Sequence, residues 1–259
     1  MLGELYAGSL ADAERRRELI SIDVLEKNAL SNAPALDALK FLAPSANVKI
    51  LAEVKRASPS RGQLAEIPDP AALAKIYSDN GASAISVLTE ERKFKGSLDD
   101  LESVRAVVDV PLLRKDFIAN EYQILEARAA GADIVLLIVA GLKSSEIARL
   151  MEFTIQLGMT PFIETHSEDE LKLAVDLGAA LVGVNARDLS TFETDRNLFG
   201  DLVGIIPTGV IKVAESAVRN ADDIRHYREA GADVVLVGEA LVTGDPALML
   251  RSFLESGKS

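Results

Sequence analysis

The chain has 259 residues, enough for one large domain or two small ones, and 48% of them are hydrophobic, which suffices for a sizeable core. With 28 Lys and Arg against 40 Asp and Glu, the formal net charge of -12 argues against binding to nucleic acid or to an anionic membrane surface. The absence of cysteine excludes disulfides, thiolate metal ligands and a cysteine nucleophile.

Targeting segments are not predicted. The N-terminal stretch MLGELYAGSLADAERRRELI lacks an apolar core followed by a small-residue cleavage site, so it does not resemble a signal peptide. No apolar run approaches the roughly 18 residues that a membrane-spanning helix needs. We therefore expect a soluble, cytoplasmic protein.

Residues 1–46 precede the first expected strand and are predicted to form an N-terminal helical extension. Within them, the segment from Ser9 to Leu30 is charged and helix-prone, and it carries scattered apolar positions. We expect one or two extra helices here that cover one end of the main fold.

A helix-like segment followed by Gly-Ala and an apolar run recurs four times, with the glycine at Gly81, Gly131, Gly178 and Gly231. Glycine after a helix supplies the left-handed C-terminal cap, because it has no Cβ to clash there. The uninterrupted apolar run that follows is typical of a parallel strand buried on both faces. Each phrase therefore predicts the end of a helix and the strand after it.

Four further short apolar runs lie between these phrases and before them, at residues 48–52, 110–114, 160–164 and 210–214. Amphipathic helices are predicted between strands, for example over residues 121–130 and 168–177, and residues 246–254 form the last helix. Eight alternating units without a change in composition predict a closed (β/α)8 TIM barrel over residues 47–259, within a single domain. A doubly wound open sheet is the alternative, but its glycine-rich dinucleotide turn is absent.

In such a barrel the active site lies where the strands end and the following loops begin. Alternation along the first strand places Glu53 and Lys55 on the same face. Lys115, Glu164 and Glu215 follow other strands and are expected on the same rim. Each of them alone could be a solvated strand end, but so many charges facing one cavity are costly unless paired. Lysine–glutamate alternation around a partly dry cavity also suits acid–base catalysis.

The two histidines carry no metal-site pattern. His166 lies just past a strand end, so it could line the site, but a loop histidine is the favoured interpretation. His226 lies in a charged helix and is interpreted as a surface residue. A tightly bound transition metal is not expected, although an all-oxygen Mg²⁺ site stays open. Nothing is similar to a Ser–His–Asp arrangement.

Several strand-end motifs resemble those of the indole-3-glycerol-phosphate synthase family of tryptophan biosynthesis. The most specific are AEVKRASPS at residues 52–60 and LRKDFI at residues 113–118. The similarity extends from about residue 48 to 250 and includes the runs SVLTE, FKGS, LLIVA, GVNARDL, AES and VGEAL. The N-terminal extension also fits the extra helices of this family.

The resemblance implies a decarboxylating and dehydrating ring closure of 1-(2-carboxyphenylamino)-1-deoxyribulose 5-phosphate to indole-3-glycerol phosphate, without a cofactor or a metal. Lys115 is the implied acid for ring closure, with Glu53 and Lys55 beside it. Glu164 and Lys55 match the acid and base of the later steps, and which lysine acts at which step stays open. The other implied catalytic residues are Asn185, Glu215 and Ser216.

The phosphate is expected near the ends of the last two strands, where barrels commonly offer backbone N–H donors. The implied binding residues are Lys55, Ser58, Phe94, Phe117, Leu136, Arg187, Leu189, Ser216, Gly238 and Glu239. The aromatic and leucine side chains among them form the apolar wall for the anthranilate ring. Arg187 is expected to orient neighbouring carboxylates.

One departure from the family concerns Ala217, which stands where the family usually has glycine after the Ser of the seventh strand. If this position has a positive φ, or brings its N–H close to the phosphate, the methyl group costs roughly 1 kcal/mol or some affinity.

Two other functions compete with the synthase interpretation. A related phosphoribosylanthranilate isomerase usually employs a Cys–Asp pair, which this chain cannot form because it has no cysteine. A silent barrel that only binds a ligand is disfavoured, because every expected charged residue is present. We expect a monomer whose only partner is a small phosphorylated substrate.

Overall fold

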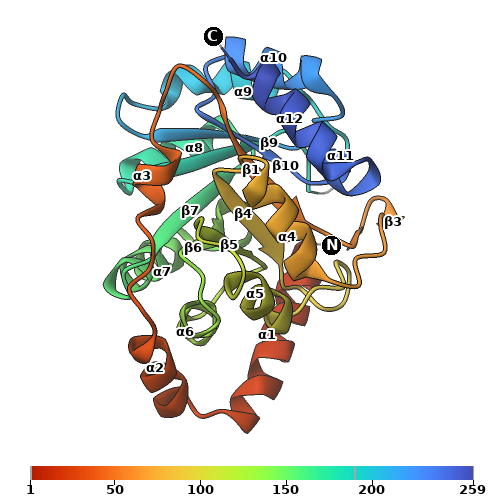
Figure 1. Ribbon diagram of the computed structural model, residues 1–259. Helices are drawn as coiled ribbons and strands as arrows, with labels where there is room; N and C mark the ends of the chain where they lie inside the picture. Colours follow the sequence, from red (N-terminus) through yellow and green to blue (C-terminus); the bar gives the residue numbers. More distant parts are fainter. Residues whose placement is uncertain (1, 190, 259) are drawn as a thin grey trace.

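Eight parallel strands form a closed barrel in the computed structural model, which describes residues 2–189 and 191–258 (Figure 1). The strand order is β1-β10-β9-β8-β7-β6-β5-β4, and β1 pairs with both β10 and β4 to close the barrel. This confirms the predicted (β/α)8 fold. The barrel strands are β1 (Lys49–Val54), β4 (Ala84–Leu88), β5 (Leu112–Lys115), β6 (Ile134–Ile138), β7 (Thr160–Thr165), β8 (Leu181–Asn185), β9 (Ile211–Glu215) and β10 (Val234–Val237).

Helices follow the strands and cover the outside of the barrel (Figure 1). These are α4 (Pro70–Asp79), α5 (Leu98–Arg105), α6 (Glu121–Ala129), α7 (Ser144–Gln156), α8 (Glu168–Asp176), α9 (Leu198–Leu202), α10 (Ala221–Glu229), α11 (Glu239–Thr243) and α12 (Pro246–Ser256), with 3-10 turns η1 (Val139–Gly141) and η2 (Val203–Ile205). As predicted, the glycines of the Gly-Ala phrases have positive φ, for example 98° at Gly81 and 97° at Gly231.

Alternation along the strands divides the apolar residues into two layers. Side chains such as Leu51, Phe162 and Leu236 fill the inside of the barrel. Their neighbours along the strands, for example Ile50 and Val235, pack outward against the helices. Both faces of each strand are therefore buried, which is why the strands are continuous apolar runs in the sequence.

The N-terminal extension forms α1 (Leu2–Leu19), α2 (Ile22–Ser31) and α3 (Ala38–Leu42). One or two helices were expected, and the described residues form three. Helix α1 also extends before the helix-prone segment from Ser9, because its first turns are stabilised by packing on the barrel rather than by a pattern of their own. Tyr6 packs edge-on against Phe117 at the carboxyl end of the barrel, whereas Lys49 at the amino end donates hydrogen bonds to carbonyl groups at the end of α3. The extension therefore covers parts of both barrel ends.

A two-stranded antiparallel hairpin, β2 (Ala57–Ser58) and β3 (Gly62–Gln63), occupies the loop after β1 and was not expected from the sequence. It projects at the right of Figure 1, beside the carboxyl ends of the strands. Among the described residues, no helix has the length and apolar character needed to cross a membrane.

Candidate active site

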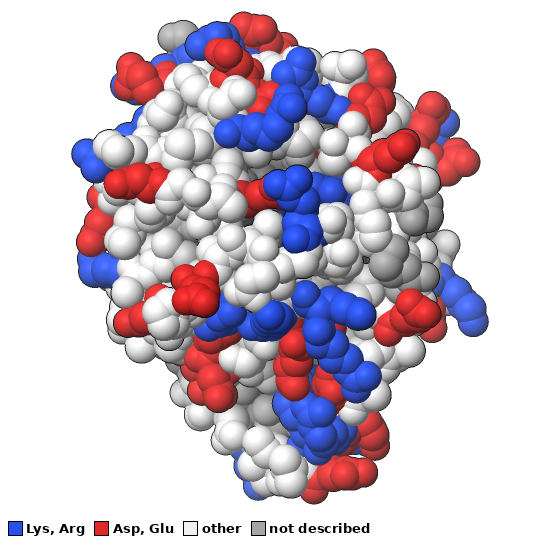
Figure 2. All heavy atoms as spheres, turned by 90° about the vertical axis from the view of Figure 1, so that its right-hand side faces the viewer, with Lys and Arg blue, Asp and Glu red and all other residues white. Residues whose placement is uncertain are grey.

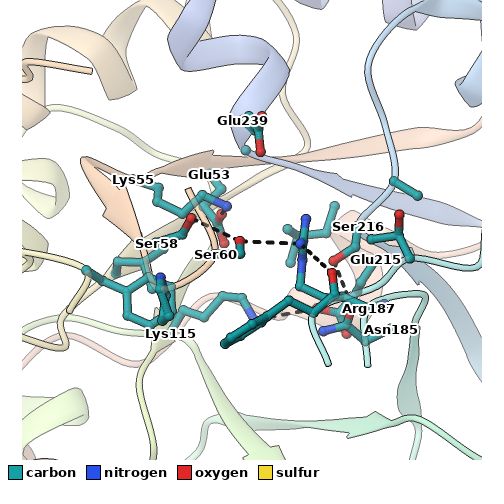
Figure 3. A pocket seen from close by; sticks show the side chains of 18 of the residues that line it. Glu53, Lys55, Ser58, Ser60, Lys115, Asn185, Arg187, Glu215, Ser216 and Glu239 are labelled. Carbon is teal, nitrogen blue, oxygen red and sulfur yellow. Dashed lines mark hydrogen bonds and ion pairs between the residues drawn. The ribbon is translucent and has the colours of Figure 1, made fainter. Parts of the chain in front are cut away.

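A cavity of about 710 Å³ opens at the carboxyl ends of the barrel strands. All of the residues implied by the sequence motifs lie in its wall, and Figure 3 shows many of them pointing toward one another from different strands. They are Glu53, Lys55, Ser58, Phe94, Lys115, Phe117, Leu136, Glu164, Asn185, Arg187, Leu189, Glu215, Ser216, Gly238 and Glu239.

Lys115 lies among carboxylates at the end of β5. Its Nζ is 3.0 Å from Glu164 Oε2 and 3.6 Å from Glu215 Oε2. Both carboxylates are almost completely buried, with 2% and 1% of their side chains exposed. A single ammonium group therefore bridges two carboxylates that have little access to water.

The charges in this cluster change one another's proton affinity. Burial alone would lower the pKa of Lys115, but Glu164, Glu215 and Glu53 hold it above its usual range. Burial would raise the pKa of Glu164, but Lys115 and His166 hold it well below its usual range. Burial and the neighbouring Glu164 raise the pKa of Glu215 to about 8, against the opposing effect of Lys115. At neutral pH the site thus holds a charged lysine, an ionised Glu164 and a protonated Glu215.

A second lysine–carboxylate pair lies at the end of β1. Lys55 Nζ is 2.6 Å from Glu53 Oε1, and the other oxygen of this carboxylate has no hydrogen-bond partner among the described residues. A Cβ on Gly238 would overlap Glu53 Oε1 and would lie 3.0 Å from Lys55 Nζ. Glycine at this position therefore lets the end of β10 approach the pair closely.

Asn185 connects the acid–base cluster to the ends of β8 and β9. Its Nδ2 donates to Glu164 Oε1 at 3.0 Å, and its Oδ1 accepts from Ser216 Oγ at 2.7 Å and from the Arg187 backbone N–H at 3.0 Å. These bonds fix which end of the amide faces the carboxylate. Asn185 thus orients Glu164 and Ser216 together.

Beside the predicted Phe94 and Phe117, the apolar wall contains residues of α1 that the sequence did not suggest. Phe94 lies 6.1 Å from Phe117 between ring centroids, and the ring of Tyr6 lies 5.6 Å from that of Phe117. Leu2 and Leu5 of α1 complete this side of the cavity. No local motif marks them, because their contacts are with strand ends that come much later in the chain.

Arg187 and His166 have contacts that differ from those expected. The Arg187 guanidinium bonds Ser60 Oγ at 3.3 Å and the Phe192 carbonyl at 3.1 Å, and so links two loops rather than orienting carboxylates in the described part of the chain. His166 was interpreted as a loop histidine, but its side chain is only 11% exposed and lies beside Glu164. Glu164 and Glu170, which lie close to His166 in the sequence, were the signal that could have identified it as part of the site.

Basic side chains gather at the mouth of the cavity although the protein is acidic overall. Figure 2 shows Lys and Arg side chains around a hollow near the centre of this face. Four arginines contribute to the cavity lining, namely Arg61, Arg187, Arg196 and Arg219. Arg61 is paired with Glu239, and Arg196 and Arg219 are paired with Asp223. Basic side chains at the mouth of a cavity can attract anionic ligands despite an unfavourable net charge.

Behind Lys115, the neighbouring Arg114 points away from the cavity and its side chain is completely buried. It forms ion pairs with Asp116 at 3.1 Å and with Glu126 at 3.2 Å. Asp116 also accepts a hydrogen bond from Ser9 of α1 at 2.8 Å. This network fixes the end of β5 against both α6 and the N-terminal extension.

The loop after β9 has an unusual backbone. Ser216 and Ala217 have φ values of 70° and 57°, in the left-handed region that side chains with a Cβ rarely adopt. Both residues line the cavity, as do Gly238 and Glu239. The positive φ that makes an alanine costly at this position is therefore present at Ala217.

Replacing Ala217 by glycine should leave the affinity for inorganic phosphate unchanged or improve it, because the left-handed conformation costs glycine nothing. Isothermal titration calorimetry measures this directly. Ala11→Gly on the exposed face of α1 is the matched control for the loss of a methyl group. It lies in a helix, where glycine should cost about 0.5–1 kcal/mol of stability. Clear weakening of phosphate binding in Ala217→Gly would show that the geometry inferred for this loop is wrong.

The fold and the site define a (β/α)8-barrel enzyme with a buried lysine–glutamate cluster in its cavity. The sequence profile of the indole-3-glycerol phosphate synthase family matches residues 2–253. The indole-3-glycerol phosphate synthase of Leifsonia xyli subsp. xyli is 63% identical over 253 residues, covering 98% of this chain and 97% of that protein. That of Streptomyces coelicolor is 50% identical, covering 100% and 96%. The chain therefore belongs to the indole-3-glycerol phosphate synthase family.

Solved structures that are similar to the chain support the fold alone. 3-Hexulose-6-phosphate synthase from Salmonella typhimurium has a TM-score of 0.63 at 15% identity, covering 81% of this chain and 98% of that one. Thiamine phosphate pyrophosphorylase from Pyrococcus furiosus has a TM-score of 0.61 at 15% identity, with coverages of 82% and 95%.

Proposed function

We propose that this chain converts 1-(2-carboxyphenylamino)-1-deoxyribulose 5-phosphate into indole-3-glycerol phosphate, CO2 and water, as a step of tryptophan biosynthesis. The observation that carries the proposal is the Lys115 ammonium, placed 3.0 Å from Glu164 in a cavity with an apolar wall on one side and the Lys55–Glu53 pair on the other. Membership of the synthase family supports the same reaction.

In the first step the aromatic carbon that bears the carboxylate attacks the ketone carbon of the substrate. Lys115 is charged and faces the cavity, so it can donate a proton to the oxygen as negative charge develops there. The carboxylate then leaves as CO2, and its electron pair restores the benzene ring. Lys115 recovers its proton from solvent or from a neighbouring acid.

The later steps remove the new hydroxyl group. An acid protonates this hydroxyl so that it leaves as water, and a base removes a proton from the adjacent carbon to complete the indole ring. Lys55 and Glu164 are the candidates, and Glu164 is the ionised carboxylate of the two that face Lys115. The reaction consumes one proton in total, because the substrate carboxylate leaves as neutral CO2.

Binding of the substrate divides between two ends of the cavity in this proposal. The phosphate lies near Ser58, Ser216 and the backbone of Gly238 and Glu239, with the charge of Lys55 nearby. The anthranilate ring lies against the aromatic and leucine wall. The arginines of the mouth attract a substrate that carries both phosphate and carboxylate groups.

The proposal further places the protein in the cytoplasm as a monomer, with neither nucleic acid nor a membrane as a partner. The formal net charge of -12 supports the exclusion of polyanionic partners. It does not oppose the small substrate, since the basic residues are concentrated where that substrate enters.

The reaction is tested by incubating the protein with the carboxyphenylamino-deoxyribulose phosphate and following indole fluorescence. The chain has no tryptophan, so the protein background is low. We expect fluorescence to rise with enzyme concentration and one CO2 to be released for each indole formed. The absence of both signals at micromolar enzyme would exclude the synthase function.

A further inference from the structure

His166 is a buried titratable group that the proposed reaction does not use. It follows the end of β7 by one residue and lies in the loop before α8. Its ring lines a second cavity of about 490 Å³, beside the first, together with Glu170 and residues of α1. Its side chain is only 11% exposed, so the ring lies between the acid–base cluster and this second cavity.

The imidazole lies between two carboxylates. Nε2 is 3.2 Å from Glu164 Oε1, at the distance of an ion pair but without the geometry of a hydrogen bond, and Nδ1 is 3.3 Å from Glu170 Oε2. Glu170 is itself fixed, because the same Oε2 accepts the His166 backbone N–H at 2.7 Å. A ring held between two carboxylates is electrostatically favoured as the doubly protonated imidazolium.

We infer that His166 is a positioning residue for Glu164, and that its imidazolium, anchored on Glu170, holds this carboxylate ionised and aligned with Lys115. Glu164 then receives a positive neighbour on each oxygen, Lys115 at Oε2 and His166 at Oε1. The consequence for catalysis rests on the proposed function, in which Glu164 is a candidate base of the dehydration.

The other groups around Glu164 do not replace His166. Asn185 on β8 donates a hydrogen bond but is neutral, Glu215 on β9 is protonated near neutral pH, and Glu53 on β1 brings negative charge. Tyr6 of α1 is also neutral, because burial and Glu164 hold its pKa above the usual range. Lys55 is engaged with Glu53 at 2.6 Å.

The charge state of His166 follows from its two partners. Burial alone would lower the pKa of the ring, but Glu164 and Glu170 raise it to about 10. Removal of the imidazolium should therefore raise the pKa of Glu164 toward its ordinary value. The fraction of ionised Glu164 would then fall as the pH is lowered.

The first test needs no substrate. In the intact protein, the imidazole nitrogens of His166, assigned by their loss in His166→Gln, are followed by ¹⁵N NMR from pH 5 to 9. We expect His166 to remain doubly protonated at pH 8, well above the ordinary histidine pKa of about 6.5. A neutral ring at pH 7 would overturn the inference, whether or not the protein has synthase activity.

The second test compares variants in the indole assay. His166→Gln should lower kcat by about ten- to a hundredfold with little change in KM, because a misplaced catalytic group loses rate rather than binding. Its activity relative to the unchanged protein should fall further between pH 6 and pH 4, where a carboxyl with an ordinary pKa of about 4.3 becomes protonated. His166→Lys should recover the pH behaviour, since the second cavity leaves space for a longer cationic side chain.

Two controls separate positioning from loss of structure. Glu170→Gln keeps the imidazole and should change kcat in the same direction but less. His226→Gln, at a histidine of α10 outside the cavity lining, should have no effect on the pH dependence. Thermal unfolding checks that each variant is folded. An activity ratio of His166→Gln that stays constant with pH would contradict the inference even where turnover itself is observed.

Discussion

The Lys115→Met variant is expected to lose about a thousandfold or more in kcat, because the oxyanion of ring closure then has no proton donor at the end of β5. The fold should survive, since methionine has a similar volume and Glu215 is already protonated near neutral pH. His166 also stays beside Glu164 and compensates part of its charge. Indole fluorescence measures the turnover, and calorimetry measures substrate binding, which should be largely retained.

Lys172→Met is the matched control for this variant. Lys172 also pairs with a glutamate, Glu168 at 2.6 Å, but on the exposed surface of α8. This control should keep full turnover, because a surface ion pair contributes little and no reacting group is involved. A Lys115→Met protein that is unfolded would instead place Lys115 among structural residues, and one that retains most of its turnover would exclude it as the acid.

Arg114→Met is expected to destabilise the protein by about 3–5 kcal/mol, the cost of removing one partner from a buried ion pair. The loss leaves Asp116 and Glu126 buried without the guanidinium that joins them, and it also removes a hydrogen bond to the Gln123 carbonyl at 2.6 Å. Urea denaturation followed by circular dichroism gives the change in the free energy of unfolding.

The control for this effect is Arg225→Met on α10. Arg225 pairs with Asp222 at 2.8 Å, and both side chains are exposed, so its removal should cost less than about 1 kcal/mol. Arg114→Lys should fall between the two, because lysine keeps the charge but not the planar set of donors. A loss below about 1 kcal/mol in Arg114→Met would show that the buried network contributes little to stability.

The barrel itself was predictable because its signals are local. Each Gly-Ala phrase combines a helix end that requires a positive φ with a run of apolar residues buried on both faces, as at Gly131 and the strand from Ile134 to Ile138. The convergence of Glu53, Lys115 and Glu164 was predictable for a related reason. Parallel strands in a closed barrel end on one side, so residues at strand ends become neighbours whatever their separation in sequence.

The parts that the sequence did not reveal depend on contacts between distant segments. Helix α1 begins at Leu2 rather than Ser9, because its first turns pack on strand ends more than a hundred residues later. The short hairpin of β2 and β3 contains too few residues to show a strand pattern. The sequence favours a loop histidine at position 166, because a single histidine has no periodicity. Its place in the site is determined by Glu164 and Glu170, which lie on either side of the ring.

The position of α1 has a consequence for how the protein folds. Tyr6 contacts the carbonyl of Ile138, 132 residues further along the chain, and Leu2 and Leu5 meet the same strand ends. Helix α1 therefore has no surface to bind until β5 and β6, which come much later in the chain, have been synthesised and paired. Because closing so long a loop is slow and entropically costly, docking of α1 should be a late event in folding. The protein would then acquire its barrel before it acquires a complete substrate pocket.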